Sequence, residues 1–400
     1  MKRISICFSL CLLFACSVTE KAPPSSAVKL LTSPAEAGSG EPYLFTDSGG
    51  KTYLTWMEEK TDSSKLRYAI LQEEGWSQPH DIAEGTNWFI NWADYPAIAV
   101  TENHQMMAHI LQRSGEGTYA YDVNLITSHD GSSWRNPLLL HDDGKQAEHG
   151  FVTLLPYGEN FFATWLDGRN TVSEEMETHE GHQGAMSIRA AILNAQGGKI
   201  AEWELDDRTC DCCQTTAAIT ANGPVVLYRN RSDEEIRDIA IVRWTDDQWT
   251  APQVIHPDNW KIAGCPVNGP RADALGNHLA VAWFTATPEE SIVYVVFSPD
   301  GGETFGDAVR IDDGKTIGRV DLVMLDENSA AVTWMEGPDI KIRKVYSNGK
   351  KEGSIIIATT SDSRSSGFPQ MTRSGNELIF AWTDDNEETI KTALLNLGHL

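Results

Sequence analysis

Short apolar segments alternate with polar turns along the chain, and the same order of segments recurs about every 50 residues. Each copy begins with an apolar stretch that follows a glycine, a proline or an aromatic residue in the sequence. The seven openings are GEPYLF from Gly40, DYPAIAV from Asp94, HGFVTLL from His149, CQTTAAI from Cys213, NGPRADA from Asn268, GRVDLVM from Gly318 and GFPQMT from Gly367. The pattern therefore predicts seven repeated β units.

A second apolar segment follows each opening after about ten residues, as the spacing of short strands in all-β proteins requires. It carries tryptophan at a fixed position in five copies, and histidine or tyrosine in the other two: Trp56, Trp165, Trp283, Trp334, Trp382, His109 and Tyr228. A third and a fourth strand follow in most copies. Four short strands per repeat predict an all-β, seven-bladed β-propeller. Six blades is the alternative if one weak copy is an excursion from its neighbour.

The two ends of the repeated region complement each other. The seventh copy stops one strand short, and the segment from Ala27 to Leu31 is a strand without a repeat of its own. If this segment completes the last blade, the ring closes and no long sheet edge stays exposed. We therefore expect residues 27–400 to form a single propeller domain.

The first residues carry an export pattern. Met1-Lys2-Arg3 precedes an apolar run that is too short to span a membrane and ends in Leu13-Phe14-Ala15-Cys16. This ending resembles the lipobox of bacterial lipoproteins, which implies a signal peptide over residues 1–15, acylation of Cys16 and a polar tether over residues 16–26. The resemblance implies a lipid-anchored protein of the bacterial cell envelope at the outer membrane, on its periplasmic or its surface side. A plain signal peptide with an incidental cysteine is the alternative.

The formal charge is −25 at pH 7. Binding to phosphate groups needs a basic face, so this charge argues against nucleic acid and against anionic lipid as partners. We expect a monomer that meets the membrane only through its lipid anchor. The remaining partner classes are a small molecule, a glycan or a metal ion.

Two turn segments have a recurrent composition. Ser298-Pro299-Asp300-Gly301-Gly302-Glu303-Thr304-Phe305 fits the pattern Ser-x-Asp-x-Gly-x-Thr-Trp/Phe, and Ser128 to Trp134 is a variant one residue shorter. The aspartate can satisfy backbone N–H groups of the turn, and glycine permits left-handed φ. These turns resemble the Asp-box of sialidases and related BNR-repeat propellers, in which the box is structural and lies away from the ligand face.

The same resemblance suggests, as one alternative, an exo-acting glycoside hydrolase of sialidase type. Sialidases hold the substrate carboxylate with three arginines, the first of them at the opening of the first blade. Here that opening reads Gly40-Glu41-Pro42-Tyr43, without an arginine. The catalytic candidates that remain are four arginines and one aspartate: Arg169, Arg229, Arg231, Arg319 and Asp94. Whether the protein is an enzyme therefore stays open at this stage.

The strand order of a propeller brings two sets of loops to one face: those that lead into each innermost strand and those between the second and third strands. Nearly all cysteines, paired histidines and clustered arginines of the repeats fall in these loops. The candidates for ligand binding are Trp88, Trp92, His149, Asp167, Arg169 and Asn268. Trp88 and Trp92 could stack on a planar ligand or be buried in the loop, and Asp167 could pair with Arg169 or contact a ligand.

Four cysteines fall in the same set of loops. Cys210, Cys212 and Cys213 form a C-x-C-C run, and Cys265 lies at the next opening. One interpretation is a structural disulfide, since exported proteins meet an oxidising compartment. A second is a thiolate site for copper(I) or zinc(II), with His149 or His182 as further ligands. A redox-active pair is the third.

These observations favour an envelope-anchored propeller that binds a metal ion or a small ligand in a pocket rich in cysteine, histidine and arginine. Two alternatives remain. One is the sialidase-type hydrolase, and the other is a protein-interaction scaffold whose cysteines form structural disulfides.

Overall fold

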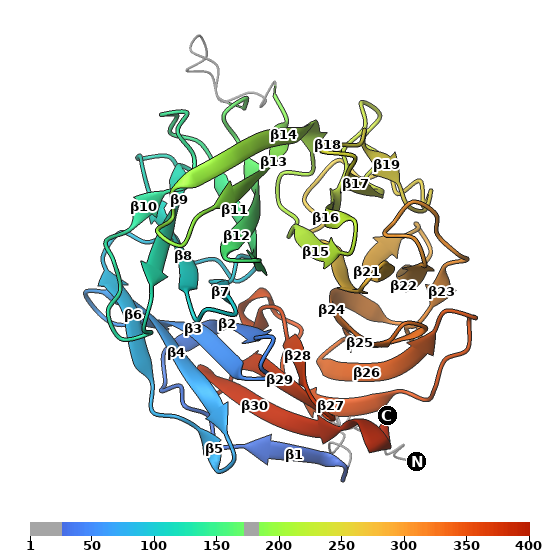
Figure 1. Ribbon diagram of the computed structural model, residues 1–400. Helices are drawn as coiled ribbons and strands as arrows, with labels where there is room; N and C mark the ends of the chain where they lie inside the picture. The colour runs from blue at the N-terminus through green and yellow to red at the C-terminus, as the bar shows by residue number, and fades with distance from the viewer. Residues whose placement is uncertain (1–25, 172–183) are drawn as a thin grey trace, which may run out of the picture.

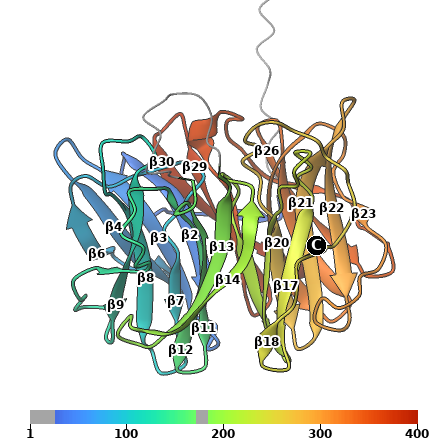
Figure 2. The ribbon, with the colours of Figure 1, turned by 90° about the horizontal axis from the view of Figure 1, so that it is seen from above.

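The computed structural model describes residues 26–171 and 184–400. Seven antiparallel sheets stand around a central axis and form a closed ring (Figure 1). The strands run between two faces made of loops (Figure 2). The prediction of a seven-bladed propeller is therefore confirmed, and the six-bladed alternative is wrong.

The blades follow the order of the chain, and we number them 1 to 7. Blade 1 contains β2 (Ser39–Thr46), β3 (Thr52–Glu59), β4 (Ser64–Gln72), β5 (Gly75–Trp76) and β6 (His80–Gly85). Blade 2 contains β7 (Ile98–Val100), β8 (Met106–Arg113), β9 (Tyr121–Ser128) and β10 (Leu138–Leu139), and blade 3 contains β11 (His149–Tyr157), β12 (Asn160–Asp167), β13 (Met186–Leu193) and β14 (Lys199–Thr209). Blade 4 contains β15 (Thr216–Thr220), β16 (Gly223–Arg229), β17 (Ile239–Thr245), β18 (Gln248–Trp249) and β19 (Gln253–Val254).

Blade 5 contains β20 (Arg271–Leu275), β21 (His278–Ala286), β22 (Ser291–Ser298) and β23 (Val309–Arg310). Blade 6 contains β24 (Thr316–Asp326), β25 (Ser329–Glu336), β26 (Asp339–Tyr346) and β27 (Ile355–Thr359). Blade 7 contains β28 (Gln370–Ser374), β29 (Glu377–Asp384), β30 (Thr389–Asn396) and β1 (Val28–Leu31). Two short 3-10 turns, Arg364–Ser366 and Leu397–His399, complete the described elements.

The N-terminal strand closes the ring. β1 pairs antiparallel with β30, with Val28 opposite Leu395 and Leu31 opposite Thr392. Trp76 of blade 1 donates from its indole nitrogen to the hydroxyl of Thr392 at 3.0 Å, so the first blade also contacts the last. The expected completion of the seventh blade by the segment 27–31 is confirmed.

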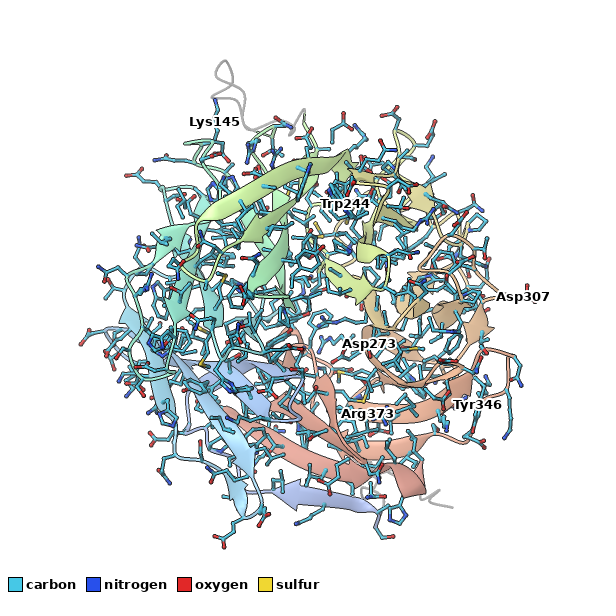
Figure 3. The ribbon with its side chains drawn as sticks, in the orientation of Figure 1. Lys145, Trp244, Asp273, Asp307, Tyr346 and Arg373 are labelled. Atoms are coloured by element: carbon cyan, nitrogen blue, oxygen red, sulfur yellow. The ribbon has the colours of Figure 1, made fainter. Side chains whose placement is uncertain are left out.

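The core lies between neighbouring blades, because the middle strands bury both faces of their sheets. The fixed-register residues Trp56, Trp165, Trp283, Trp334 and Tyr228 have no exposed surface. Side chains of adjacent sheets share a cluster, as those of β22 do with those of β24 and β25, and they fill the space between the ribbons (Figure 3). Apolar burial on both faces explains why these strands read as nearly continuous apolar runs.

Both Asp-box segments form the turns that their composition predicts. Asp300 accepts the backbone N–H of Thr304 at 2.9 Å, and Asp130 accepts that of Ser133 at 2.7 Å. Gly301 and Gly131 have φ values of 73° and 72°, which glycine adopts without steric cost. Each box follows the third strand of its blade, β22 or β9, so it has a structural role at the turn.

Candidate functional site

Three innermost strands bend sharply where they enter the sheet. β2, β11 and β24 each contain a register shift, between Gly40 and Tyr43, between Gly150 and Thr153, and between Gly318 and Asp321. At each bend one residue other than glycine has a left-handed backbone: Glu41 (φ 51°), Phe151 (φ 55°) and Arg319 (φ 54°). Such strain is uncommon and redirects the side chains at the rim of the ring.

A series of hydrogen bonds at the rim of the ring connects blades 4, 5 and 6. The backbone N–H of Asn268 donates to the sulfur of Cys213 at 3.4 Å, and the side-chain oxygen of Asn268 accepts the N–H of Arg319 at 2.7 Å. Residues that are far apart in sequence therefore lie together, as the strand order of a propeller predicts. The side chain of Asn268 is itself occupied by backbone partners.

The four cysteines are free thiols within the described residues. Cys210 and Cys213 are buried, Cys212 is half-buried and Cys265 is exposed. The sulfurs of Cys210 and Cys213 lie 3.6 Å apart, well beyond the length of about 2.05 Å that a disulfide bond requires. Those of Cys210, Cys212 and Cys213 lie within 4.8 Å of one another, and Cys265 interacts with Cys212. The four cysteines thus form one cluster without a disulfide.

Two of the thiols are poised to ionise. Hydrogen bonds from Cys212 and Cys213, followed by the charges of Arg237 and Arg229, hold the pKa of Cys210 well below its usual value. Arg237 donates to the sulfur of Cys210 at 3.0 Å. A hydrogen bond from Cys212 also lowers the pKa of Cys265. The thiolate is the form of cysteine that ligates metals and attacks electrophiles, and the nearby arginines favour this form of Cys210.

The candidate arginines each have partners of their own. Arg229 is buried and donates to the backbone carbonyls of Asn268 (2.8 Å), Arg237 (2.6 Å) and Phe284 (2.6 Å). Arg319 donates to the carbonyl oxygens of Ser363 (2.8 Å) and Gly367 (2.9 Å). Both guanidinium groups thus stabilise loops of the rim.

The other two arginines form ion pairs with carboxylates. Arg231 contacts Asp211 at 2.8 Å and Glu235 at 2.9 Å. Arg169 contacts both oxygens of Asp167 at 2.8 Å. A three-arginine clamp needs three guanidinium groups that point at one carboxylate. Within the described residues, no two of these four arginines contact the same carboxylate.

The tryptophan candidates are engaged in packing. Trp92 stacks on Phe368 with ring centroids 5.6 Å apart, and the guanidinium of Arg319 lies 5.3 Å from the Trp92 centroid and 5.9 Å from that of Phe368. Trp88 packs against the core cluster that blades 1 and 2 share. For both residues the structure favours burial in the loop over stacking on a ligand.

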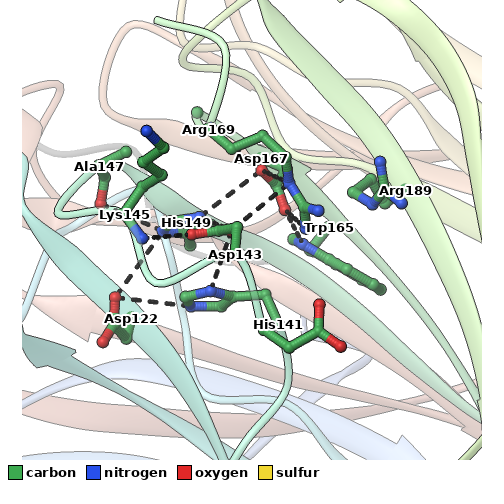
Figure 4. Close-up of polar contacts among 12 residues, drawn as sticks. Asp122, His141, Asp143, Lys145, Ala147, His149, Trp165, Asp167, Arg169 and Arg189 are labelled. Atoms are coloured by element: carbon green, nitrogen blue, oxygen red, sulfur yellow. Dashed lines mark hydrogen bonds and ion pairs between the residues drawn. The ribbon is translucent and has the colours of Figure 1, made fainter. Parts of the chain in front are cut away.

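The histidine candidates do not join the cysteines. His149 stacks on His141, and its nitrogens face Asp143, Asp122 and Asp167 (Figure 4). The expectation that His149 adds a ligand to the thiolate cluster is wrong, because the groups that share a possible metal position with His149 are His141 and these aspartates and not the cysteines. His182 lies outside the described residues.

Sequence reasoning missed an acidic group beside the rim. Glu148 directly precedes β11, and Tyr121 donates its hydroxyl to the Glu148 carboxylate at 2.8 Å. Burial, with the nearby charges of Asp211 and Asp94, raises the pKa of Glu148 to about 8. The position of Glu148 at a strand entry was available as a signal, but its pairing with Tyr121 depends on the contact between blades 2 and 3.

Asp94 caps the strained entry of the next blade. Its carboxylate accepts the N–H of Phe151 at 2.6 Å, and burial raises its pKa to about 7. The raised value means that the folded protein keeps this proton between about pH 4 and pH 7, where the unfolded chain has lost it. The contribution of Asp94 to stability therefore falls as the pH rises through this window and stays constant above it.

We expect Asp94→Asn to remove this dependence, because the amide oxygen still accepts the N–H of Phe151 and carries no charge. The variant should gain stability relative to the wild type as the pH rises from 4 to 8, by at most about 4 kcal/mol. Thermal unfolding across this range measures the difference. The exposed Asp62→Asn variant serves as the control and should follow the wild type; a constant difference between D94N and wild type would contradict the expectation.

Comparisons with known proteins agree with the fold. A family model described as a BNR repeat-like domain matches residues 55–380. No curated protein matches the sequence. Within the described residues, no helix has the length and apolar character needed to cross a membrane.

Solved structures with a similar fold include enzymes that act on polysaccharides. The polysaccharide lyase Uly1 is 8% identical, with 90% of each chain covered and a TM-score of 0.55. An α-L-arabinanase of Penicillium chrysogenum is 9% identical, with 95% of this chain and 99% of that chain covered and a TM-score of 0.52. An ulvan lyase is 12% identical, with 80% of each chain covered and a TM-score of 0.50. At these identities the likeness concerns the fold alone.

Proposed function

This chain belongs to the BNR repeat-like domain family, and from that premise we propose that it is an envelope-anchored propeller that holds a zinc ion at its rim. The ligands are the thiolates of Cys210, Cys212, Cys213 and Cys265. The separation of 3.6 Å between the sulfurs of Cys210 and Cys213 carries the proposal. A tetrahedral zinc site with Zn–S bonds of about 2.3 Å has neighbouring sulfurs about 3.8 Å apart.

Two guanidinium groups lie beside the cluster, where they would balance the charge of a loaded site. A zinc ion with four thiolate ligands carries a net charge of −2, which has to be balanced in a buried site. Arg237 and Arg229 both act on Cys210, and Arg229 also acts on Cys213. Two guanidinium groups therefore offset the charge of the loaded site. Copper(I) also prefers sulfur, so it is the competing metal.

The metal would join two loops of the rim. Cys210 to Cys213 lie between β14 and β15, and Cys265 lies in the connection from β19 to β20. These loops precede the innermost strands of blades 4 and 5, so a common ion fixes the rim to which Asn268 and Arg319 also belong. On this proposal the metal has a structural role at a pocket for a small ligand or a glycan.

Metal analysis of the purified mature domain tests the proposal. We expect zinc to be retained on the cysteines, and Cys210→Ser and Cys213→Ser to lose it. Free-thiol counting should find the four thiols protected until a chelator is added. Cys16→Ser is a matched control, because it makes the same substitution before the repeated part of the sequence and should keep the metal. Four reactive thiols in protein that takes up neither zinc nor copper(I) would overturn the proposal.

A second candidate function is the hydrolysis or lysis of a polysaccharide. The pair of Tyr121 and Glu148 favours it, since a carboxyl group that stays protonated at neutral pH serves as a general acid. Against it, Tyr121 is fully buried and stacks on Phe89 with centroids 4.0 Å apart, so its oxygen is not placed as a nucleophile. Turnover of a sialoside or an acidic polysaccharide that is lost in Glu148→Gln would establish this function.

The anchoring at Cys16 belongs to the same proposal. Incorporation of labelled palmitate into the full chain, abolished in Cys16→Ser, would establish acylation. Fractionation of the envelope would then locate the protein at the outer membrane, and protease accessibility of intact cells would identify the side. Cleavage without acylation would support a plain signal peptide instead.

A further inference from the structure

Two buried histidines stack on each other between blades 2 and 3. His141 lies in the connection from β10 to β11, and His149 begins β11. Their ring centroids are 3.6 Å apart with planes inclined by 4°. Both residues are buried, and the carboxylates of Asp122, Asp143 and Asp167 surround them (Figure 4).

All four ring nitrogens face oxygen acceptors. Nδ1 of His149 lies 3.2 Å from the carbonyl oxygen of Ala147, and its Nε2 lies 2.9 Å from Oδ2 of Asp143. Nδ1 of His141 lies 3.3 Å from the same Asp143 oxygen, and its Nε2 lies 3.5 Å from Oδ1 of Asp122. Neither nitrogen of His141 makes a hydrogen bond, although both are buried.

Three carboxylates surround the rings, and Arg169 balances only part of their negative charge. A neutral imidazole has one N–H group and one lone pair, so two neutral rings would direct two lone pairs at carbonyl or carboxylate oxygens. Two protonated rings would instead stack face to face as like charges. A divalent cation at the shared edge supplies the charge without these conflicts.

We propose that this cluster is a second metal site, for a divalent ion such as zinc, with His149 Nε2, His141 Nδ1, Asp143 Oδ2 and Asp167 Oδ1 as its ligands. The ligand atoms of Asp143, His149 and Asp167 lie within 4.8 Å of one another. The separations around Asp143 and His149 are 2.9, 3.3 and 3.6 Å. Tetrahedral zinc with nitrogen and oxygen ligands at about 2.0–2.1 Å has neighbouring donors about 3.3 Å apart.

The groups behind these ligands fit the same assignment. Metal-bound histidines donate their other N–H to a carbonyl or a carboxylate, which fixes the tautomer. Ala147 offers its carbonyl to His149, and Asp122 offers its carboxylate to His141. Asp143 accepts the backbone N–H of Lys145 at 2.7 Å on the oxygen that faces away from the rings. Both imidazoles therefore leave the nitrogen on the Asp143 side for the ion.

Two adjustments accompany loading. A metal lies in the plane of each imidazole that binds it, so the stacked rings have to tilt apart from their near-parallel arrangement. Arg169 Nε lies 2.8 Å from Oδ1 of Asp167 and 3.4 Å from Oδ2 of Asp143, so the guanidinium has to move away from these two oxygens when the ion binds. The ion would then join the connection between blades 2 and 3 to the end of β12, independently of the cysteine site.

Cobalt(II) substitution distinguishes the two sites on the intact mature domain. Thiolate ligation gives an intense sulfur-to-cobalt charge-transfer absorption, whereas a site of histidine and aspartate gives only weak ligand-field bands. We expect two equivalents of metal per chain, one of each spectral type. His149→Asn and His141→Asn should lose the equivalent without charge transfer and keep the other. His256→Asn, which removes an imidazole paired with Asp258 at 2.7 Å elsewhere, is the matched control and should bind as the wild type does.

If the histidine variants do not fold, the wild type still decides the question. Cobalt that binds after the thiols are blocked, and that raises the unfolding temperature in proportion to the logarithm of its concentration, supports the site. A protein that binds no divalent ion other than on its cysteines overturns this inference and leaves the cysteine proposal intact. A protein that binds a single equivalent without charge transfer, lost in His149→Asn, supports this inference and overturns the cysteine proposal.

Discussion

Replacing Arg229 with methionine should destabilise the ring by about 4 kcal/mol, because three backbone carbonyls of the rim lose a donor at once. Arg229 has only 1% of its surface exposed and contacts the carbonyls of Asn268, Arg237 and Phe284. These acceptors belong to the backbone, so no compensating substitution removes them. The guanidinium also lies over the ring of Trp260 at 4.9 Å, and methionine retains only part of that contact.

Equilibrium unfolding in denaturant measures this loss. Arg229→Lys is the matched comparison, since it keeps the positive charge but cannot reach three carbonyls in a planar arrangement. We expect the lysine variant to lose about half as much stability as the methionine variant. Equal stability of Arg229→Met and the wild type would show that these carbonyls find other partners and that the residue is available for a ligand.

The fold was predictable from the sequence because each repeat contains the apolar pattern of its strands and the residues of its turns. The aromatic register from Trp56 to Trp382 marks the second strand of the blades, since that strand is buried on both faces and needs large apolar side chains. Glycine and aspartate at fixed positions specify the Asp-box turns. The missing strand of the last repeat and the extra strand before the first predicted the closure of the ring.

The chemistry of the site was only partly predictable. Strand order alone brings Cys213, Asn268 and Arg319 to one rim, and the structure has these contacts. The direction of each side chain is set by bulges and by contacts between blades, which leave no mark in one sequence. For this reason the stacking of His149 on His141 and the pairing of Tyr121 with Glu148 were missed.

The burial of charged side chains was also hard to predict from the sequence. Arg229 is a natural candidate for binding an anion when its sequence position alone is known, because arginine is seldom fully buried. In the structure its donors are consumed by the backbone carbonyls of Asn268, Arg237 and Phe284. A charged residue at a propeller rim is thus as consistent with satisfying the loops as with binding a ligand, and only the acceptors around it decide between the two.

Removal of the closing strand should open the ring and have the other large effect. Deleting residues 27–31 removes the backbone pairing of Val28 to Leu31 with β30 and the apolar contacts of Val28 in the last blade. Hydrogen bonds of this kind contribute about 1 kcal/mol each, and each partly buried aliphatic side chain adds a similar amount, so the total loss is about 5 kcal/mol. The unpaired edge of β30 is then free to pair with another chain.

We therefore expect the shortened protein to unfold at lower temperature and to self-associate, as sedimentation and thermal unfolding would measure. A chain that begins at Ser26 keeps the strand and is the control for removal of the preceding residues. A synthetic peptide with the sequence of residues 27–31 and short flanks should restore the monomer when added in excess, because strand addition to an open edge depends on backbone pairing. A shortened protein that stays monomeric with unchanged stability would mean that contacts between blades 1 and 7, such as that of Trp76 with Thr392, hold the ring closed without the strand.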